Sequence, residues 1–451
     1  MKNDLRFQEE NTMEQSSCFR EFARYTVFSV LGTLGVSCYI LADTFFVSKG
    51  LGTNGLAALN LAIPIYNFIH GTGLMLGMGG ATKFSVCKGQ NRQGEVNRIY
   101  TNILELALLL SVLFMLPGVL FPHRLANLLG ADEAVFEMTA TYLRWLLIFS
   151  PAFILNDVYV CFVRNDDSPQ LAMAAMMIGS FANIFFDYLF IFPMQMGIFG
   201  AVFATGFSPL ISMAVMSPHW LKKKNTFHWV RTKPCFTIAK QSLSLGFPSL
   251  VAQVSSGLVM IVFNIIILDL KGNTGIAAYG IIANLSLVVT AVYSGLAQGM
   301  QPLVSHFYGM GNKPQTRMVL RYAMVTMLVL SGMIYGLIGL FTQPIIGIFN
   351  SENNRQLQEI AAVGLRLYFV SSPFIGYNTV LAMFFTSVER AMPAHVLSLL
   401  RGFIFIIPAA FGFSVLWGMT GVWMVYPLVE AVVMLFGLWA DKRYRSLLLF
   451  T

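Results

Sequence analysis

The sequence predicts an all-α membrane protein that crosses the bilayer twelve times, with six helices in each of two halves. Three observations lead to this prediction. The 451 residues are 56% hydrophobic and only 11% charged, whereas an ordinary soluble protein has roughly 25% charged residues. Uncharged stretches of about 20 residues, the length of a helix that spans a bilayer, recur along the chain. A hydrophilic segment near the middle divides these stretches six and six.

The predicted spans are apolar windows bounded by charged residues, prolines and glycines. In chain order they cover residues 24–48, 56–86, 98–121, 137–162, 170–192, 197–218, 243–269, 276–307, 318–342, 358–385, 394–414 and 419–440. The expected organisation is an N-terminal tail (1–23), an N-lobe (24–218), a linker (219–242), a C-lobe (243–440) and a C-terminal tail (441–451). The first 21 residues carry five acids and three bases without an apolar core, which is not typical of a cleavable signal peptide.

The distribution of Lys and Arg predicts the orientation, because cytoplasmic loops carry the excess of these residues. With the N-terminus inside, only six of the 29 basic residues fall in segments expected outside: Lys49, Arg124, Arg144, Lys271, Arg355 and Arg366. We therefore expect both termini in the cytoplasm and the chain in a bacterial plasma membrane. The net charge of +8 then reflects the topology. We do not expect a nucleic-acid partner, because the sequence has no basic stripe interleaved with aromatic residues.

The sequence contains no motif that predicts an enzyme. The six histidines show no metal-ligand spacing, and neither GxxxxGK[ST] nor GxSxG occurs. The five cysteines are odd in number and lie in apolar spans or on the expected cytoplasmic side, so we expect free thiols. A secondary transporter without a cofactor fits these observations better than an ATP-driven pump.

An internal repeat relates the two halves. At an offset near 220, GTNGLAAL (52–59) aligns with GNTGIAAY (272–279). In the same frame Gly79 and Gly89 match Gly299 and Gly309, while Pro169 matches Pro393 at an offset of 224. Because six is an even number of spans, the repeats have parallel topology and are related by an axis along the membrane normal. Two such halves would enclose a cavity between them.

Few ionisable residues fall inside the predicted spans, and a carboxylate in the hydrocarbon region usually faces a cavity and has a function. Asp43 and Asp187 each lie about five residues, or roughly 7 Å, below the outer end of a span. Asn183 shares a helix face with Asp187, and Thr205 reaches a similar depth on the next span. These four side chains could hold Na⁺ through oxygen ligands. They could equally share a proton, because two like charges close together in a low-dielectric site do not both ionise readily.

The second half provides an internal control for this layer. At an offset of 221, Asn264 and Pro408 occupy the positions of Asp43 and Asp187, so the two acids are confined to the first half. Three further acids, Glu105, Asp157 and Glu430, also fall in spans. Each could form an ion pair with an arginine such as Arg401, or lie near an interface.

Several segments together resemble the multidrug and toxic compound extrusion (MATE) transporters, in particular the DinF-like branch that includes MepA-type exporters. The resemblance covers about residues 22–440 and rests on ADTFFV (42–47) followed by LGTNGLAAL, GMGGATKFSVCKGQN, PAFILNDVYVCFVRNDDSP, NIFFD (183–187) and GAVFAT (200–205). It implies two six-helix bundles of the MATE fold around a V-shaped cavity, with alternating access driven by inward H⁺ or Na⁺. It also implies that Asp43, Asp187, Asn183 and Thr205 form the coupling site.

Two departures from the family pattern accompany the resemblance. The seventh span offers Gln253 and serines where the NorM-like branch has a glutamate. The loop after the fourth span reads RNDD (164–167), where the family often has an arginine followed by small residues.

The function that we expect is export of amphipathic, cationic organic compounds by a monomeric antiporter, with a role in antibiotic resistance. Polar groups in spans prefer the protein interior, and such groups predict a substrate cavity lined by Tyr39, Tyr66, Asn67, His70, Asn156 and Asn284. The alternative within the same superfamily is a flippase for a lipid-linked or polysaccharide precursor. Such a flippase needs a basic cavity, for which only Arg144, Arg366 and Arg401 are available. A channel remains an alternative, and a membrane-embedded enzyme lacks a clustered catalytic motif.

Overall fold

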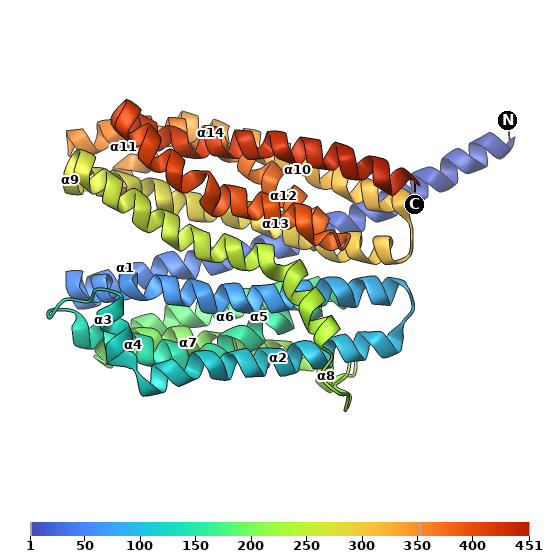
Figure 1. Cartoon of the computed structure of the whole chain (residues 1–451), viewed down its shortest axis with the longest axis horizontal. Coiled ribbons are helices and arrows are strands. Elements are labelled where there is room, and N and C mark those ends of the chain that lie inside the picture. Colours follow the sequence, from blue (N-terminus) through green and yellow to red (C-terminus); the bar gives the residue numbers. More distant parts are fainter. Residues whose placement is uncertain (1, 351–353, 451) are drawn as a thin grey trace.

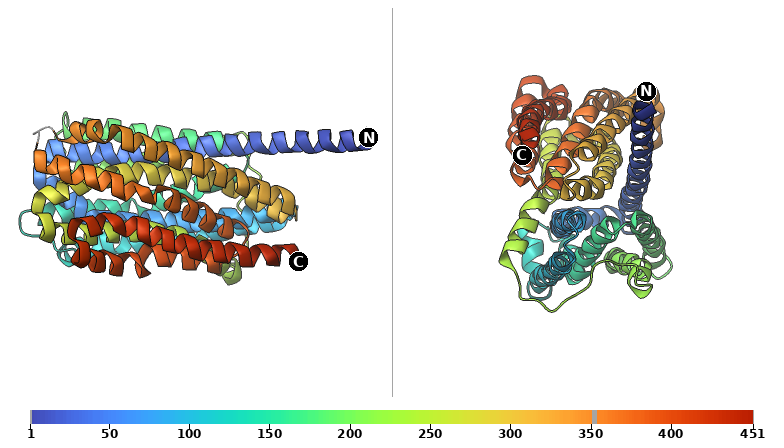
Figure 2. Two further views of the ribbon diagram at one scale, coloured as in Figure 1. Left: turned by 90° about the horizontal axis from the view of Figure 1, so that it is seen from above. Right: turned by 90° about the vertical axis from the view of Figure 1, so that its right-hand side faces the viewer.

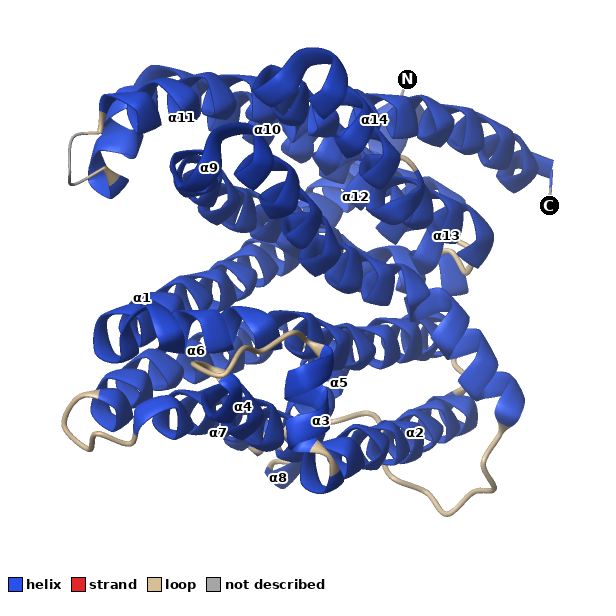
Figure 3. Cartoon of the chain, turned by 60° about the vertical axis from the view of Figure 1, so that its left-hand side comes forward, coloured by secondary structure: helices blue, strands red, loops and turns tan. Residues whose placement is uncertain are grey.

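The computed structural model shows a bundle of long helices arranged in two halves (Figure 1). It describes residues 2–350 and 354–450, with side chains for 16–350 and 354–443. The described residues form helices and loops, and no strand occurs among them. Figure 3 shows the halves stacked on each other, α1 to α8 in one and α9 to α14 in the other.

The first half consists of the helices before the linker, which end at residue 221. Its helices are α1 (Lys2–Gly89), α2 (Gln93–Leu120), α3 (Pro122–Leu128), α4 (Phe136–Ile148), α5 (Ser150–Asn165), α6 (Pro169–Ile191), α7 (Gly197–Met216) and α8 (Pro218–Leu221). Helices α4 and α5 form one span that bends by 47°. Pro151 lies in the first turn of α5, where a missing backbone N–H costs nothing.

The second half follows a linker without helix that ends at Cys235. Its helices are α9 (Phe236–Gly309), α10 (Lys313–Phe349), α11 (Arg355–Tyr368), α12 (Ser372–Ser387), α13 (Ala391–Leu399) and α14 (Ile406–Phe450). A short 3₁₀ turn at Phe369–Ser371 joins α11 to α12, and a π-helical turn at Leu400–Ile404 precedes α14.

Twelve spans result when the longest helices are divided at their glycine turns. Eight helices of the described chain are long and apolar enough to cross a membrane, or nine with the bent α4–α5 pair. Three of these, α1, α9 and α14, each contain an interruption, at Gly52, Gly272 and Gly418, and therefore cross twice. The predicted fold class is confirmed.

The repeat motif marks two of these turns. Gly52 has φ 68° and ψ −160°, and Gly272 has φ 61° and ψ −153°. This region of backbone conformation is accessible essentially to glycine alone. The match between GTNGLAAL and GNTGIAAY therefore reflects the same backbone reversal in both halves.

Both chain termini lie at the same end of the molecule as the linker, which we call the linker end (Figure 1). The segments expected as tails are helical: α1 begins at Lys2 and its first part extends beyond the bundle (Figure 2). Phe19 and Phe22 of this helix pack against Tyr322 of α10, with ring centroids 5.3 Å and 5.8 Å apart. The start of α1 therefore contacts the second half before the rest of the helix joins the first.

Glycines matched in the repeat lie where the two halves meet. A Cβ atom at Gly79 would overlap the carbonyl oxygen of Ser242, and one at Gly299 would lie 2.6 Å from the Cα of Thr26. Small residues allow such close approach of helix backbones in a membrane. The remaining matched pair also faces across this interface: Gly89 and Gly309.

Candidate functional site

The carboxylates of Asp43 and Asp187, which we call the acid pair, are both buried in the first half. Asp43 lies on the first part of α1 and Asp187 near the end of α6, with 7% and 0% of their surfaces exposed. The two side chains are close enough to interact electrostatically. One oxygen of each, Oδ1, is buried without a hydrogen-bond partner. Helix α1 continues to its turn at Gly52, beyond the predicted end of the span at residue 48, so Asp43 lies deeper than the sequence suggested.

Asn183 and Thr205 lie beside Asp187, as the depth argument predicted. With the amide nitrogen of Asn183 facing Asp187, it donates to Oδ2 over 3.0 Å, and the amide oxygen accepts from the backbone N–H of Thr205 over 3.2 Å. The hydroxyl of Thr205 donates to the carbonyl of Ala201 at 3.0 Å. This arrangement fixes α6 against α7 and leaves the two Oδ1 atoms as the unsatisfied acceptors of the acid pair.

Tyr142 on α4 is a member of this site that the sequence did not single out. It is buried, lies within electrostatic range of both carboxylates of the acid pair and interacts with the side chain of Thr205. A tyrosine in the outer part of the fourth predicted span was the available signal. The sequence alone could not show that α4 turns this residue toward α1 and α6.

The predicted cavity residues fall into one connected group and three separate positions. The hydroxyls of Tyr39 and Tyr66 are 2.5 Å apart, and the Tyr66 ring stacks on the His70 ring with 5.9 Å between centroids. Asn67 faces Gly257 of α9. Oδ1 of Asn156 is buried without a partner, whereas Asn284 lies partly exposed on α9.

The three remaining acids differ in their surroundings. Glu430 of α14 forms an ion pair with Arg401 at 2.8 Å and accepts a hydrogen bond from Asn378 at 2.7 Å. Asp157 pairs with His70, whose Nδ1 lies 2.8 Å from Oδ2 of the carboxylate. Oε2 of Glu105 is buried without a partner. One acid of the three thus has the arginine partner that the sequence suggested, and Asp157 has a histidine instead.

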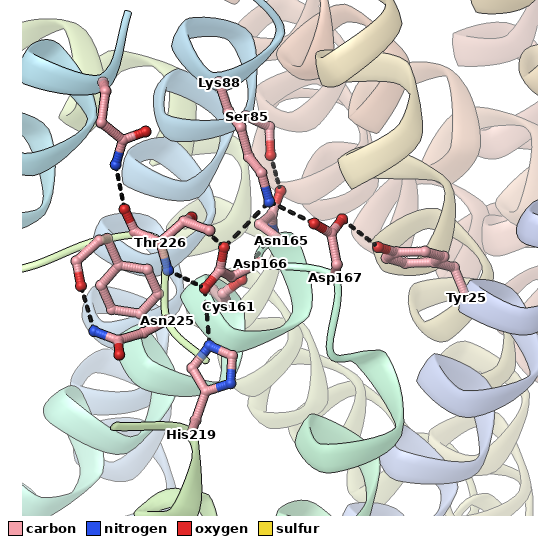
Figure 4. Close-up of polar contacts among 12 residues, drawn as sticks. Tyr25, Ser85, Lys88, Cys161, Asn165, Asp166, Asp167, His219, Asn225 and Thr226 are labelled. Carbon is pink, nitrogen blue, oxygen red and sulfur yellow. Dashed lines mark hydrogen bonds and ion pairs between the residues drawn. The ribbon is translucent and has the colours of Figure 1, made fainter. Parts of the chain in front are cut away.

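A second polar cluster lies at the linker end, around the loop after α5 (Figure 4). Asp166 accepts hydrogen bonds from Nε2 of His219 at 2.8 Å and from the backbone N–H and hydroxyl of Thr226. Nζ of Lys88 lies 3.1 Å from Asp166 and 2.6 Å from Asp167. Burial opposes ionisation of Asp166, but the hydrogen bonds from His219 and Thr226 together with Lys88 lower its pKa below the ordinary value of 3.8. Asp166 of the RNDD loop therefore anchors the linker.

Polar contacts join the two halves at this end. Arg164 donates to Gln298 at 2.8 Å, and Asn165 donates to Gln301 at 3.0 Å. Lys83 forms an ion pair with Glu389 at 3.0 Å. The halves are thus held together by side chains near the linker, away from the acid pair.

Comparison with known proteins identifies the family. The MatE family model matches residues 29–189 and 248–411. The chain belongs to the MatE family. The two matched segments fall one in each half, as expected of a fold built from a repeat. The resemblance to MATE transporters seen in the sequence is confirmed, and this family membership makes the chain a transporter rather than an enzyme.

Two similar proteins come from Staphylococcus. A multidrug export protein MepA from Staphylococcus saprophyticus is 24% identical over 411 residues, which cover 91% of this chain and 90% of that protein. A MepA from Staphylococcus aureus is 23% identical over 413 residues with the same coverage. These relatives agree with a multi-pass protein of the plasma membrane.

Solved MATE structures share the fold. The outward-facing conformation of a multidrug resistance MATE family transporter of the MOP superfamily has a TM-score of 0.90, at 22% identity and with 96% of each chain covered. A MOP superfamily transporter from Pyrococcus furiosus, described as having a binding pocket of reverse polarity, has a TM-score of 0.88 at 22% identity over 95% of this chain and 96% of that chain. The twelve-span arrangement is therefore that of known MATE proteins.

Proposed function

We propose that this MATE transporter exports amphipathic organic cations in exchange for inward protons, with the acid pair as the coupling site. The names of its MepA relatives support multidrug export. The small-molecule substrates would be exported across the plasma membrane of a bacterium. This export would reduce the sensitivity of the bacterium to antibiotics. The coupling ion would bind in the first half and the substrate between the halves.

One observation carries the coupling assignment: two buried carboxylates lie within electrostatic range of each other, and each has one oxygen without a hydrogen-bond partner. Such an arrangement binds a cation readily, because an unpaired charge in a low-dielectric site costs several kcal/mol. Release of the cation restores that cost. The acid pair therefore exists in two states of different charge, which is what coupling to a second ligand requires.

The surrounding hydrogen bonds favour a proton over Na⁺. The oxygen of Asn183 is used on the Thr205 amide, and the hydroxyl of Thr205 donates to Ala201. Two buried carboxylate oxygens remain without a donor, and a proton on the acid pair supplies one. Na⁺ at this place would require Asn183 to turn its oxygen toward the ion, together with Asp43, Asp187 and Thr205.

The transport cycle would alternate the access of a site between the halves. The side-chain contacts at the linker end would have to open for access from that side, which we assign to the cytoplasm together with both termini because it carries the basic linker. The N-lobe (24–218) and C-lobe (243–440) would move as the two units, joined by the linker at 219–242. Each chain contains both halves of the proposed cavity, so a monomer is sufficient.

The flippase alternative has less support in the arrangement of basic residues. Arg401 is neutralised by Glu430, and Arg144 and Arg366 are exposed. A phosphate group entering between the halves would find no free arginine among these three. We therefore favour an organic cation as substrate.

Efflux of ethidium from proteoliposomes under an imposed H⁺ or Na⁺ gradient tests this proposal. We expect efflux with the H⁺ gradient alone and its loss in Asp43→Asn. Efflux driven only by Na⁺ would overturn the choice of ion. Equal efflux by wild type and Asp43→Asn would overturn the coupling site, and translocation of a lipid-linked precursor without any ethidium efflux would favour the flippase.

A further inference from the structure

We propose that His70 and Asp157 form a second exchange site, at which an organic cation replaces a proton. In this exchange the proton leaves the imidazolium of His70, and the carboxylate of Asp157 becomes the counter-ion of the substrate. The inference rests on the proposed function, because it assumes an organic cation as cargo. It assigns a place for that cation apart from the acid pair.

The first support is the contact itself. Nδ1 of His70 on α1 lies 2.8 Å from Oδ2 of Asp157 on α5, and 22% and 11% of the two side chains remain exposed. Both side chains therefore keep some exposed surface, whereas Asp187 has none. A cation can approach the pair over this surface.

The chain also makes room for this carboxylate. A Cβ atom at Gly73 of α1 would lie 2.5 Å from Oδ2 and 2.9 Å from Cβ of Asp157. Any side chain at position 73 would displace the acid from His70. A glycine one turn after His70 is thus part of the geometry that brings the two groups together.

The second half lacks the same pair. In the frame that matches Gly79 with Gly299, Thr290 corresponds to His70 and Tyr293 corresponds to Gly73. The segment SPAFILND (150–157) matches SPFIGYNT (372–379), so Thr379 corresponds to Asp157. Neither threonine ionises. The pair is therefore not a requirement of the repeated fold, and an ionisable pair inside a span is functional by default.

The surroundings of the pair suit an aromatic cation. The Tyr66 ring stacks on His70, and its hydroxyl contacts that of Tyr39, one helical turn before Asp43. An aromatic face next to a carboxylate is a favourable environment for a cation. The other ionisable groups near Asp157 are Tyr39 and Tyr66 on α1 and Cys161 on its own helix. Across from Gly71, α9 presents Leu250 and Gln253, which carry no charge.

The exchange conserves charge at this site. With a proton on His70, the imidazolium and the carboxylate of Asp157 sum to zero. When that proton leaves as the cation binds, neutral imidazole, carboxylate and bound cation again sum to zero. One proton is released for each cation bound here, in addition to a proton from the acid pair.

Proton release on ethidium binding tests the inference with full-length protein in detergent. A weakly buffered solution with a pH indicator reports the protons released, and ethidium fluorescence reports the dissociation constant between pH 5.5 and 8.5. We expect wild type to release about two protons per ethidium, so that the dissociation constant falls about a hundredfold for each pH unit in the steepest region. His70→Gln should release one fewer and show a tenfold dependence, because glutamine still donates to Asp157 but carries no titratable proton.

Asp157→Asn provides the second variant and Thr290→Val the matched control in the other half. We expect Asp157→Asn to release one proton fewer and to bind ethidium at least tenfold more weakly at pH 8, while Thr290→Val behaves as wild type. Wild-type proton release in both His70→Gln and Asp157→Asn would overturn this inference while leaving the acid pair intact as coupling site. Wild type that binds no organic cation would overturn the proposed function, and this inference with it.

Discussion

The two halves of the molecule share a fold but differ in whether their buried carboxylates have a partner of opposite charge. The first half buries Asp43 and Asp187 with an unsatisfied oxygen on each. The second half has Asn264 and Pro408 at the corresponding positions, and one of its buried acids, Glu430, is paired with Arg401 and hydrogen-bonded to Asn378. One half therefore holds a charge that can change, and the other holds a charge that is compensated.

This difference indicates that the two repeats have different roles. A buried ion pair with further hydrogen bonds is costly to break and fixes its helices in one arrangement. An uncompensated acid pair is stabilised whenever a cation binds, because the cost of its buried charge is removed. Under the proposed function, the first half is thus suited to respond to an ion, and the pair of Glu430 and Arg401 is suited to hold the second half in one arrangement.

The largest expected effect follows from removing the changeable charge. Asp187→Asn should reduce proton-driven ethidium efflux to background, because a neutral amide cannot bind and release a proton. The folded protein should be at least as stable as wild type, since a buried carboxylate without a counter-charge is removed. Efflux from proteoliposomes and thermal unfolding of the same preparation measure both.

Asn264→Ala is the matched control for this prediction in the second half. It occupies the position equivalent to Asp43 and should retain efflux. Efflux at the wild-type level in Asp187→Asn would remove the distinction between the halves.

Removing the charge of Glu430 in the second half should destabilise the protein, in contrast to removing that of Asp187. Glu430→Gln leaves Arg401 without its counter-ion inside the bundle and should lower the free energy of unfolding by about 3 kcal/mol. The double variant Arg401→Met with Glu430→Leu should recover much of this loss, because neither charge is then unpaired. Thermal unfolding of wild type, Glu430→Gln and the double variant tests the pair, and a loss of stability in the double variant as large as that in Glu430→Gln would contradict it.

The sequence was sufficient for the fold, and it named four residues that the structure places near one another. Hydrophobic windows and the repeat predicted twelve spans, and counting residues along the helices placed Asp43, Asp187, Asn183 and Thr205 in one layer. It could not predict Tyr142, because its role depends on the rotation of α4 about its axis. Nor could it assign Asp157 to His70, since contacts between spans that lie 87 residues apart leave no periodic signal in one sequence.

The polar cluster around Asp166 belongs to the first half and predicts a change in stability of intermediate size. Asp166→Asn should destabilise the attachment of the linker by about 2 kcal/mol, because hydrogen bonds to a charged group are lost. The folded-state pKa of Asp166 is lowered below its ordinary value of 3.8. Its contribution is therefore present in full at neutral pH and is lost as the pH falls below about 4 toward the folded-state pKa.

Limited proteolysis between residues 222 and 235 at pH 7 measures this attachment. We expect faster cleavage in Asp166→Asn than in wild type. Asp167→Asn is the matched control, since its side chain is 74% exposed and should change the rate little. Equal rates for the two variants would show that the buried acid does not hold the linker.

The smallest expected effect concerns the charge that bridges the halves. Lys83 and Glu389 are 3.0 Å apart, with 18% and 28% of their side chains exposed, so their ion pair should contribute roughly 0.5–1 kcal/mol to contact at the linker end. Lys83→Met should then raise the population open at that end about two- to fivefold relative to the closed one. Distances between spin labels placed on the two halves report these populations. The exchanged pair Lys83→Glu with Glu389→Lys should return these populations toward those of wild type, because the attraction is restored with opposite polarity. Lys83 also donates a hydrogen bond to Gln241 at 2.8 Å. Populations that stay shifted in the exchanged pair would mean that Lys83 acts through Gln241 rather than through Glu389.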